Sequence, residues 1–245
     1  MIKIGIRILP TDLQKANRDI SKLARKEITN KNGHRQTVYV KLGIPIKKDG
    51  KMDNLDGYRE SVQKIAQRVH EQIESGKKRP QEPLEKVKIG RVEPWIIKNA
   101  REVGLDIEGF DHEVSNYFIQ HVIKNHGDEK TEVSRGNLPV TDEDIEQIPA
   151  IIEKPDYAIF GAKRNGGDRI IYAKLLDNGT VLYFEEILTG DKNKSLRGNT
   201  MYKTGKVLNE DELLANICMN GKTDLSNIKI ADMGGSHPTN TANQG

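Results

Sequence analysis

Two turns rich in glycine and asparagine divide residues 157–188 into three β-type segments. The turns are Asn165-Gly166-Gly167 and Asp177-Asn178-Gly179, and the segments span residues 157–162, 169–176 and 180–188. Turn sequences of this kind join neighbouring strands as tight hairpins, so the three segments are expected to form an antiparallel meander. A fourth strand is expected at 199–203, because three strands would leave the preceding helices poorly covered.

Helical patterns dominate the region before this meander. Helices are expected at 94–102, 110–125 and 141–152, the last with a break at Pro149, and a further short helix is expected at 210–219. Helices followed by a meander predict an α+β fold, with the helices packed on a small antiparallel sheet.

The two parts of the chain differ in charge. Residues 1–90 contain 21 Lys and Arg against 11 Asp and Glu, a net charge of +10, and residues 91–245 contain 18 against 25, a net charge of −7. A basic half is typical of proteins that bind an anionic partner such as nucleic acid. A solvated, lysine-rich helical face explains the same charge equally well.

The basic part also has its own pattern of elements. Alternating isoleucines predict a strand at 2–8, helical spacing predicts helices at 13–28 and 57–74, and a β-type run predicts a strand at 37–42. The expected organisation is a basic α/β domain of unknown function at 1–75, a linker at 76–90, an α+β module at 91–232 and a disordered tail at 233–245.

Several classes of protein are disfavoured. The chain has a single cysteine, Cys218, and no Cys/His set with zinc-finger spacing, so neither a disulfide framework nor a metal site is expected. No apolar window reaches eighteen residues, and no phosphate-binding glycine loop or nucleophile motif is present. A soluble, cytoplasmic protein without a cofactor is expected.

Two histidines stand near the end of the helix expected at 110–125. His121 and His126 lie about 140° apart around a helix, so they are not expected to chelate one metal ion. His126 precedes Gly127, which suits the left-handed position after a helix, and the helix dipole there favours the imidazolium. Such a histidine suits a phosphate ligand or a general acid, and a capping or buried histidine is the alternative.

Cations and hydroxyls gather after the third strand, within the acidic half. They are Lys192, Lys194, Arg197, Thr200, Tyr202 and Lys203. These donors suit a phosphodiester, although a solvated hairpin has the same composition. Glu185 and Glu186 end the third strand on opposite faces, so one of them is a candidate general base unless both are solvated.

Four motifs carry a resemblance to a known family. They are His121-Val122-Ile123-Lys124-Asn125-His126, Pro139-Val140-Thr141, Ile148-Pro149 leading to Pro155-Asp156, and Thr200-Met201-Tyr202-Lys203. In this order, over about residues 110–206, they resemble the phage-associated branch of the barnase/EndoU/colicin/RelE-like (BECR) nuclease superfamily.

The resemblance implies a metal-independent, toxin-type endoribonuclease encoded by a phage or mobile element. Its substrate would be RNA such as tRNA, cleaved to 2′,3′-cyclic phosphate ends, and its partner an immunity protein or a phage structural protein. The implied catalytic residues are His126, His121, Thr200, Tyr202, Lys203 and Glu185, with Arg197, Lys174 and Lys194 binding the phosphate. The alternative is a catalytically silent nucleic-acid-binding module or a phage head-associated structural protein.

Overall fold

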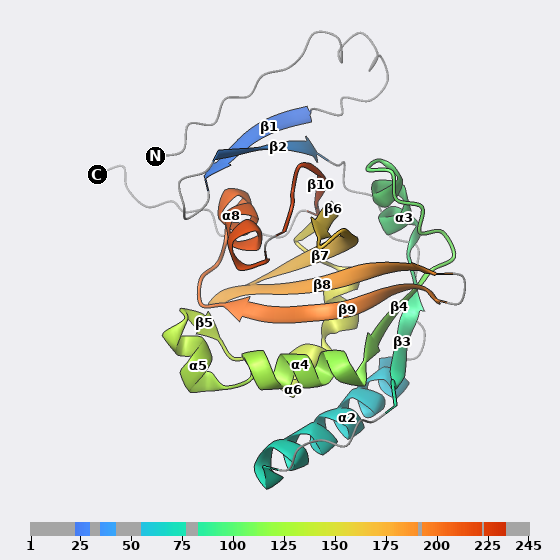
Figure 1. Cartoon of the computed structure of the whole chain (residues 1–245), viewed down its shortest axis with the longest axis vertical. Helices are drawn as coiled ribbons and strands as arrows, with labels where there is room; N and C mark the ends of the chain where they lie inside the picture. Colours follow the sequence, from blue (N-terminus) through green and yellow to red (C-terminus); the bar gives the residue numbers. More distant parts are fainter. Residues whose placement is uncertain are drawn as a thin grey trace.

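The structure is a computed structural model that describes residues 23–29, 35–42, 55–76, 83–190, 193–221 and 223–233. The helices are α2 (Leu55–Ser75), α3 (Pro94–Arg101), α4 (Asn116–His126), α5 (Glu129–Ser134), α6 (Asp142–Glu146), α7 (Ile148–Glu153) and α8 (Glu210–Gly221). The strands are β1 (Leu23–Thr29), β2 (Arg35–Leu42), β3 (Lys86–Arg91), β4 (Asp111–Ser115), β5 (Asn137–Leu138), β6 (Tyr157–Arg164), β7 (Gly167–Leu176), β8 (Gly179–Gly190), β9 (Asn193–Thr204) and β10 (Asn227–Asp232). The described strands join one sheet in the order β1-β2-β10-β6-β7-β8-β9-β4-β3, and β5 pairs with β9 (Figure 1).

The predicted meander is present. β6, β7, β8 and β9 pair antiparallel in sequence order, so the expected fourth strand exists and is longer than 199–203. At the first turn Asn165 has a φ of 51° and Gly166 a φ of 81°, the two positive angles of a two-residue hairpin. The α+β class is confirmed, but the sheet is neither small nor purely antiparallel. It has ten strands among the described residues, and the β4/β9 and β2/β10 pairs are parallel.

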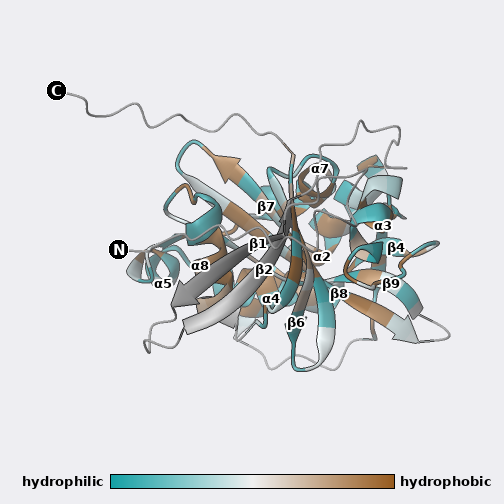
Figure 2. Ribbon diagram, turned by 90° about the horizontal axis from the view of Figure 1, so that it is seen from above, coloured by the Kyte–Doolittle hydropathy of each residue, from teal (hydrophilic) through white to brown (hydrophobic). Residues whose placement is uncertain are grey.

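Each face of the sheet is covered by its own apolar layer. One face packs against α2, α3, α4, α6 and α7, and the other packs against α8. Alternation along β8 divides the side chains between the layers, because Tyr183 belongs to the first core and Leu182 and Phe184 belong to the second. Hydrophobic stretches, brown in Figure 2, run through the central strands between these layers.

The expected linker at 76–90 does not separate two independent cores. Its last five residues, 86–90, belong to β3, which pairs with β4 at the sheet edge. Before it, α2 buries Tyr58, Val62 and Ile65 in the same core as α4 and α6, and the Tyr58 hydroxyl donates a hydrogen bond of 2.8 Å to the Ile145 carbonyl. Residues 55–75 therefore pack as part of the α+β module.

Two predicted helices are wrong in part. The helix expected at 13–28 is a strand from Leu23, because residues 23–29 pair with β2 along their whole length and sheet pairing overrides the helical spacing. The helix expected at 110–125 begins only at Asn116, since residues 111–115 form β4 between β3 and β9. Helix 57–74 and strand 37–42 are confirmed by α2 and β2.

Some expectations lie outside the described residues. They are the strand at 2–8, the beginning of the helix at 13–28 and nearly all of the tail at 233–245. Among the helices within the described ranges, none has the length and apolar character needed to span a membrane.

Candidate active site

Helix α4 lies against the free edge of β9 and carries two histidines to it. The Ser115 hydroxyl accepts the Phe118 amide at 3.2 Å and caps the helix, which then runs to His126. β4 pairs with β9 only at residues 195–197, so the later part of β9 is left for α4 and β5 (Figure 1).

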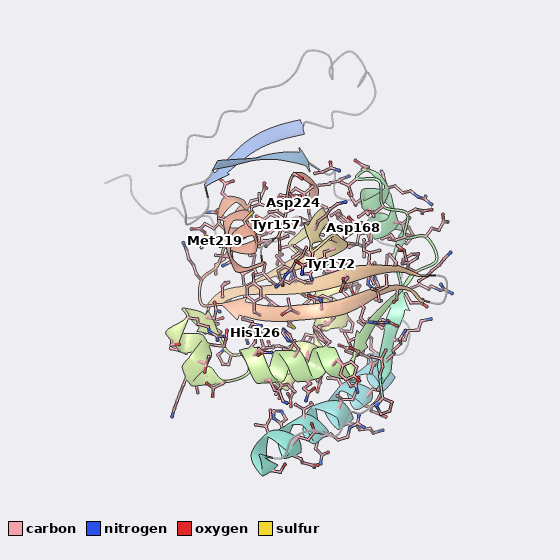
Figure 3. The ribbon with its side chains drawn as sticks, in the orientation of Figure 1. His126, Tyr157, Asp168, Tyr172, Met219 and Asp224 are labelled. Atoms are coloured by element: carbon pink, nitrogen blue, oxygen red, sulfur yellow. The ribbon has the colours of Figure 1, made fainter. Side chains whose placement is uncertain are left out.

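The two histidines meet a threonine and a tyrosine of β9. His121 Nε2 lies 3.4 Å from Thr200 Oγ1, and the His121 and His126 rings are 5.9 Å apart between centroids. The His126 ring lies 6.0 Å from the Tyr202 ring, and Figure 3 shows His126 between the end of α4 and β9. Thr200 and Tyr202 are two residues apart on one strand, so they project on the same face of the sheet. Four of the predicted site residues are thus brought together.

A local contact fixes the proton of His121. The Asn125 side-chain nitrogen donates to the His121 carbonyl at 2.8 Å and to His121 Nδ1 at 3.0 Å. A carbonyl oxygen is only an acceptor, so the amide group is held with its nitrogen toward the ring. Nδ1 then accepts, and the neutral imidazole carries its proton on Nε2, toward Thr200.

His126 is oriented by a buried carboxylate. Its Nδ1 lies 3.6 Å from Glu132 Oε2, which is an ion-pair distance longer than a hydrogen bond. Glu132 is fully buried and accepts hydrogen bonds from Arg135 at 2.6 Å and from Asn137 at 3.0 Å. This carboxylate favours a proton on Nδ1, so Nε2 of His126 is left as the basic nitrogen.

Both histidines have a pKa below the ordinary value of 6.5. Burial lowers the pKa of His121, and the neighbouring charges of His126 and Arg164 lower it further. Burial also lowers the pKa of His126 and outweighs the opposing effect of Glu132. The pKa of His126 is thus shifted away from the imidazolium expected at the helix end, and burial is the largest cause.

Gly127 differs from the expected left-handed cap. Its φ is −93°, an ordinary right-handed value, and its amide donates to the Ile123 carbonyl at 3.1 Å. A Cβ at this position would lie 2.5 Å from the same carbonyl oxygen. Glycine is therefore required at this position by close packing and not by a special backbone angle.

The two glutamates that end the third predicted strand have different surroundings. Glu185 is fully buried and accepts hydrogen bonds from His112 Nδ1 at 2.9 Å and from the Tyr172 and Tyr183 hydroxyls at 3.1 Å each. This burial excludes direct contact with a substrate, so the prediction of Glu185 as a base there is wrong. Glu186 projects to the opposite face, remains half-buried and contacts Asn199 at 3.4 Å.

Most of the predicted cations are elsewhere. Lys203 projects to the face opposite Tyr202 and forms an ion pair of 2.6 Å with Asp144. The other cations are occupied or distant: Lys174 pairs with Asp156 at 3.2 Å, Arg197 pairs with Glu113 at 2.6 Å, and exposed Lys194 lies about 20 Å along β9 from Thr200. Lys192 lies outside the described residues. Because carboxylates already neutralise three of these charges, they are poor candidates for binding phosphate.

Sequence reasoning missed the arginines that flank the first hairpin turn. Arg169 lies opposite Ala162 and Glu186 in the sheet, and Arg164 is two residues beyond Ala162 on the same strand. Ala162 belongs to the core beneath α8, so these side chains share the face that carries Thr200 and Tyr202. Alternation around the Asn165-Gly166-Gly167 turn is the signal that places both arginines on one face.

The described residues hold no metal-ligand cluster, and one groove lies away from the clustered histidines. Within the described ranges, no group of three or more His, Cys, Asp or Glu side chains is placed to hold a metal ion. A groove of about 760 Å³ lies among α2, α4 and α6, with His70, Ile123 and Thr141 in its lining, and it includes none of the predicted site residues.

Comparison with known families identifies the module that carries these residues. Residues 90–211 match the family model described as phage-Barnase-EndoU-ColicinE5/D-RelE like nuclease 3 (PBECR3). Searches of curated proteins and of solved structures find no match. The matched segment contains α4, β9 and the glycine hairpin, hence every residue of the cluster described above. Residues 90–211 of this chain belong to the PBECR3 family of phage-associated nucleases.

Proposed function

We propose that the protein is an endoribonuclease of the toxin type that cleaves RNA without a metal ion. The observation that supports this proposal is the meeting of His121, His126, Thr200 and Tyr202 beside β9. Cleavage by an internal hydroxyl requires one group to take a proton and another to give one. Two neighbouring imidazoles supply both, and the matched family is one of nucleases.

In the proposed reaction the ribose 2′-hydroxyl attacks the adjacent phosphorus. The O2′–P bond forms while the P–O5′ bond breaks, which gives a 2′,3′-cyclic phosphate and a 5′-hydroxyl. His126 Nε2 accepts the 2′-hydroxyl proton, because Glu132 faces its Nδ1. His121 must first take up a second proton on Nδ1, where Asn125 now donates; it then gives its Nε2 proton to O5′, and Thr200 beside it donates a hydrogen bond to a phosphate oxygen.

The direct test is incubation of the purified protein with RNA in excess EDTA. We expect cleavage to continue and the new ends to be a 2′,3′-cyclic phosphate and a 5′-hydroxyl, read by end-group mapping. Cleavage that stops when divalent ions are removed would contradict the mechanism. Binding of RNA without any cleavage would favour a silent binding module.

The lowered pKa values predict an acidic optimum for kcat/KM. The base works above its pKa and the acid works below its pKa, and burial places both below 6.5. We therefore expect the rate to be highest below pH 6.5, to fall as the pH rises through the lowered pKa of His121, and to fall again at more acidic pH, where His126 becomes protonated. The measurement is kcat/KM for a short RNA from pH 4.5 to 8.5. A maximum above pH 7.5 would show that the proton transfers are assigned to the wrong groups.

A further inference from the structure

We propose that Arg164 and Arg169 form an anion subsite beside His121, which holds an RNA phosphate next to the one that is cleaved. The inference rests on the proposed function in one respect, the identification of the cleaved phosphate with the His121 and Thr200 centre. The subsite itself is argued from the two arginines and their surroundings.

Arg169 is a buried cation without an adequate partner. Only 5% of the residue is exposed, and its Nε has no hydrogen-bond partner within the described part of the chain. A buried guanidinium normally pairs with a carboxylate or binds an anion, because an uncompensated buried charge is strongly unfavourable. No carboxylate of the described residues lies at ion-pair distance from Arg169 or Arg164. The site is therefore suited to an anion from outside the chain.

Charge at this place is positive even though the surrounding half of the protein is acidic. Arg164 and Arg169 are close enough for Arg164 to lower the pKa of Arg169, an effect that adds to the larger one of burial. Glu186, opposite Arg169 in the sheet, compensates only in part. A phosphate between the two guanidinium groups would relieve their mutual repulsion, and its geometry matches the arginine fork.

The position of the pair indicates which phosphate it takes. Arg164 stands on β6, one strand further from β9 than Arg169 on β7, and its charge still acts on His121. Arg169 lies across the sheet, one strand further from β9 than Glu186. An RNA strand with one phosphate at His121 would therefore place a neighbouring phosphate at the arginines. We expect a substrate with two phosphates to be preferred over one with a single phosphate.

Unreactive DNA oligonucleotides test the subsite separately from catalysis, because they lack the 2′-hydroxyl. We would measure by calorimetry the Kd of a deoxydinucleotide, which has one internal phosphate, and of a deoxytrinucleotide, which has two. Wild-type protein is expected to bind the second about tenfold more tightly, and Arg164→Gln and Arg169→Gln should each remove most of that difference. Inorganic pyrophosphate, added as a competitor, should weaken binding of the deoxytrinucleotide to the wild-type protein only.

Controls distinguish a specific subsite from general attraction. Arg59→Gln changes an exposed arginine on α2 and should leave both affinities unchanged. Arg164→Gln alters a half-buried side chain, so it remains informative even if Arg169→Gln does not fold. Equal affinities for the two oligonucleotides, or an equal loss in all three variants, would overturn the subsite. If pyrophosphate binds but the deoxytrinucleotide is not preferred over the deoxydinucleotide, the assignment of the subsite to a polynucleotide phosphate would be overturned. If the wild-type protein does not cleave RNA but still prefers the oligonucleotide with two phosphates, the proposed function is contradicted and this inference is not.

Discussion

Replacement of His126 by alanine is expected to lower kcat/KM for RNA cleavage by about 100- to 10,000-fold, the usual contribution of a general acid or base. The side chain is only 20% exposed, but it lies at the last residue of α4 and donates no hydrogen bond that the fold requires. The loss should therefore be in the chemistry and not in the folded structure. The measurements are steady-state cleavage of a short RNA together with far-UV circular dichroism and Tm.

A matched control comes from the same helix. Lys124→Ala removes an exposed side chain of α4 that forms no hydrogen bond or ion pair with the four clustered residues, so its cleavage rate should equal that of wild type. His121→Ala should also reduce the rate, with its largest effect on substrates that have a poor leaving group. Full activity of folded His126→Ala would assign the base to another residue.

Replacement of Glu185 by alanine is expected to lower the free energy of unfolding by about 3–5 kcal/mol, as is typical when one partner of a buried ion pair is removed. His112 is fully buried and would keep only Glu93, whose carboxylate is 3.5 Å from its Nε2. The Tyr172 and Tyr183 hydroxyls would lose their acceptor as well. Urea denaturation measures the change. Glu60→Ala, an exposed change on α2, should stay within about 0.5 kcal/mol of wild type.

The same pair makes stability depend on pH. Burial lowers the pKa of His112, but Glu185 and Glu93 more than compensate and raise it from 6.5 to about 9. Since the folded pKa is above the unfolded one, the contribution is complete below pH 6.5 and is lost as the pH rises through about 9. Wild-type stability should fall over that window, and His112→Phe should flatten the dependence. An unchanged dependence in that variant would show that His112 is not the titrating group.

Local sequence rules were sufficient for the elements whose conformation depends on near neighbours. The asparagine and glycine turns predicted the β6, β7 and β8 meander, since positive φ angles in a two-residue loop determine a hairpin. Apolar spacing predicted α2, and Pro149 predicted the division between α6 and α7. The same spacing failed at 23–29, where pairing with β2 across the sheet decides the conformation.

The residues of the candidate site were likewise only partly predictable from the sequence. His121 and His126 were recognisable from their motif, and Thr200 and Tyr202 from the cluster on the last strand of the meander. Lys203 was wrongly included, because the sequence does not reveal that Asp144 pairs with it on the other face. Arg164 and Arg169 were missed, because an arginine near a turn looks solvated until the sheet buries it.

The sequence by itself determined the α+β class, the hairpins and the family to which residues 90–211 belong, because these depend on periodicity, turn chemistry and local motifs. Only the tertiary structure decided which of two adjacent glutamates is buried, which cations are neutralised and where α2 packs. Alternation along a strand assigns side chains to two faces, but only the packing of helices on each face decides which of these side chains are buried. That choice buried Glu185 beneath the helices and left Glu186, Thr200 and both arginines on the opposite face.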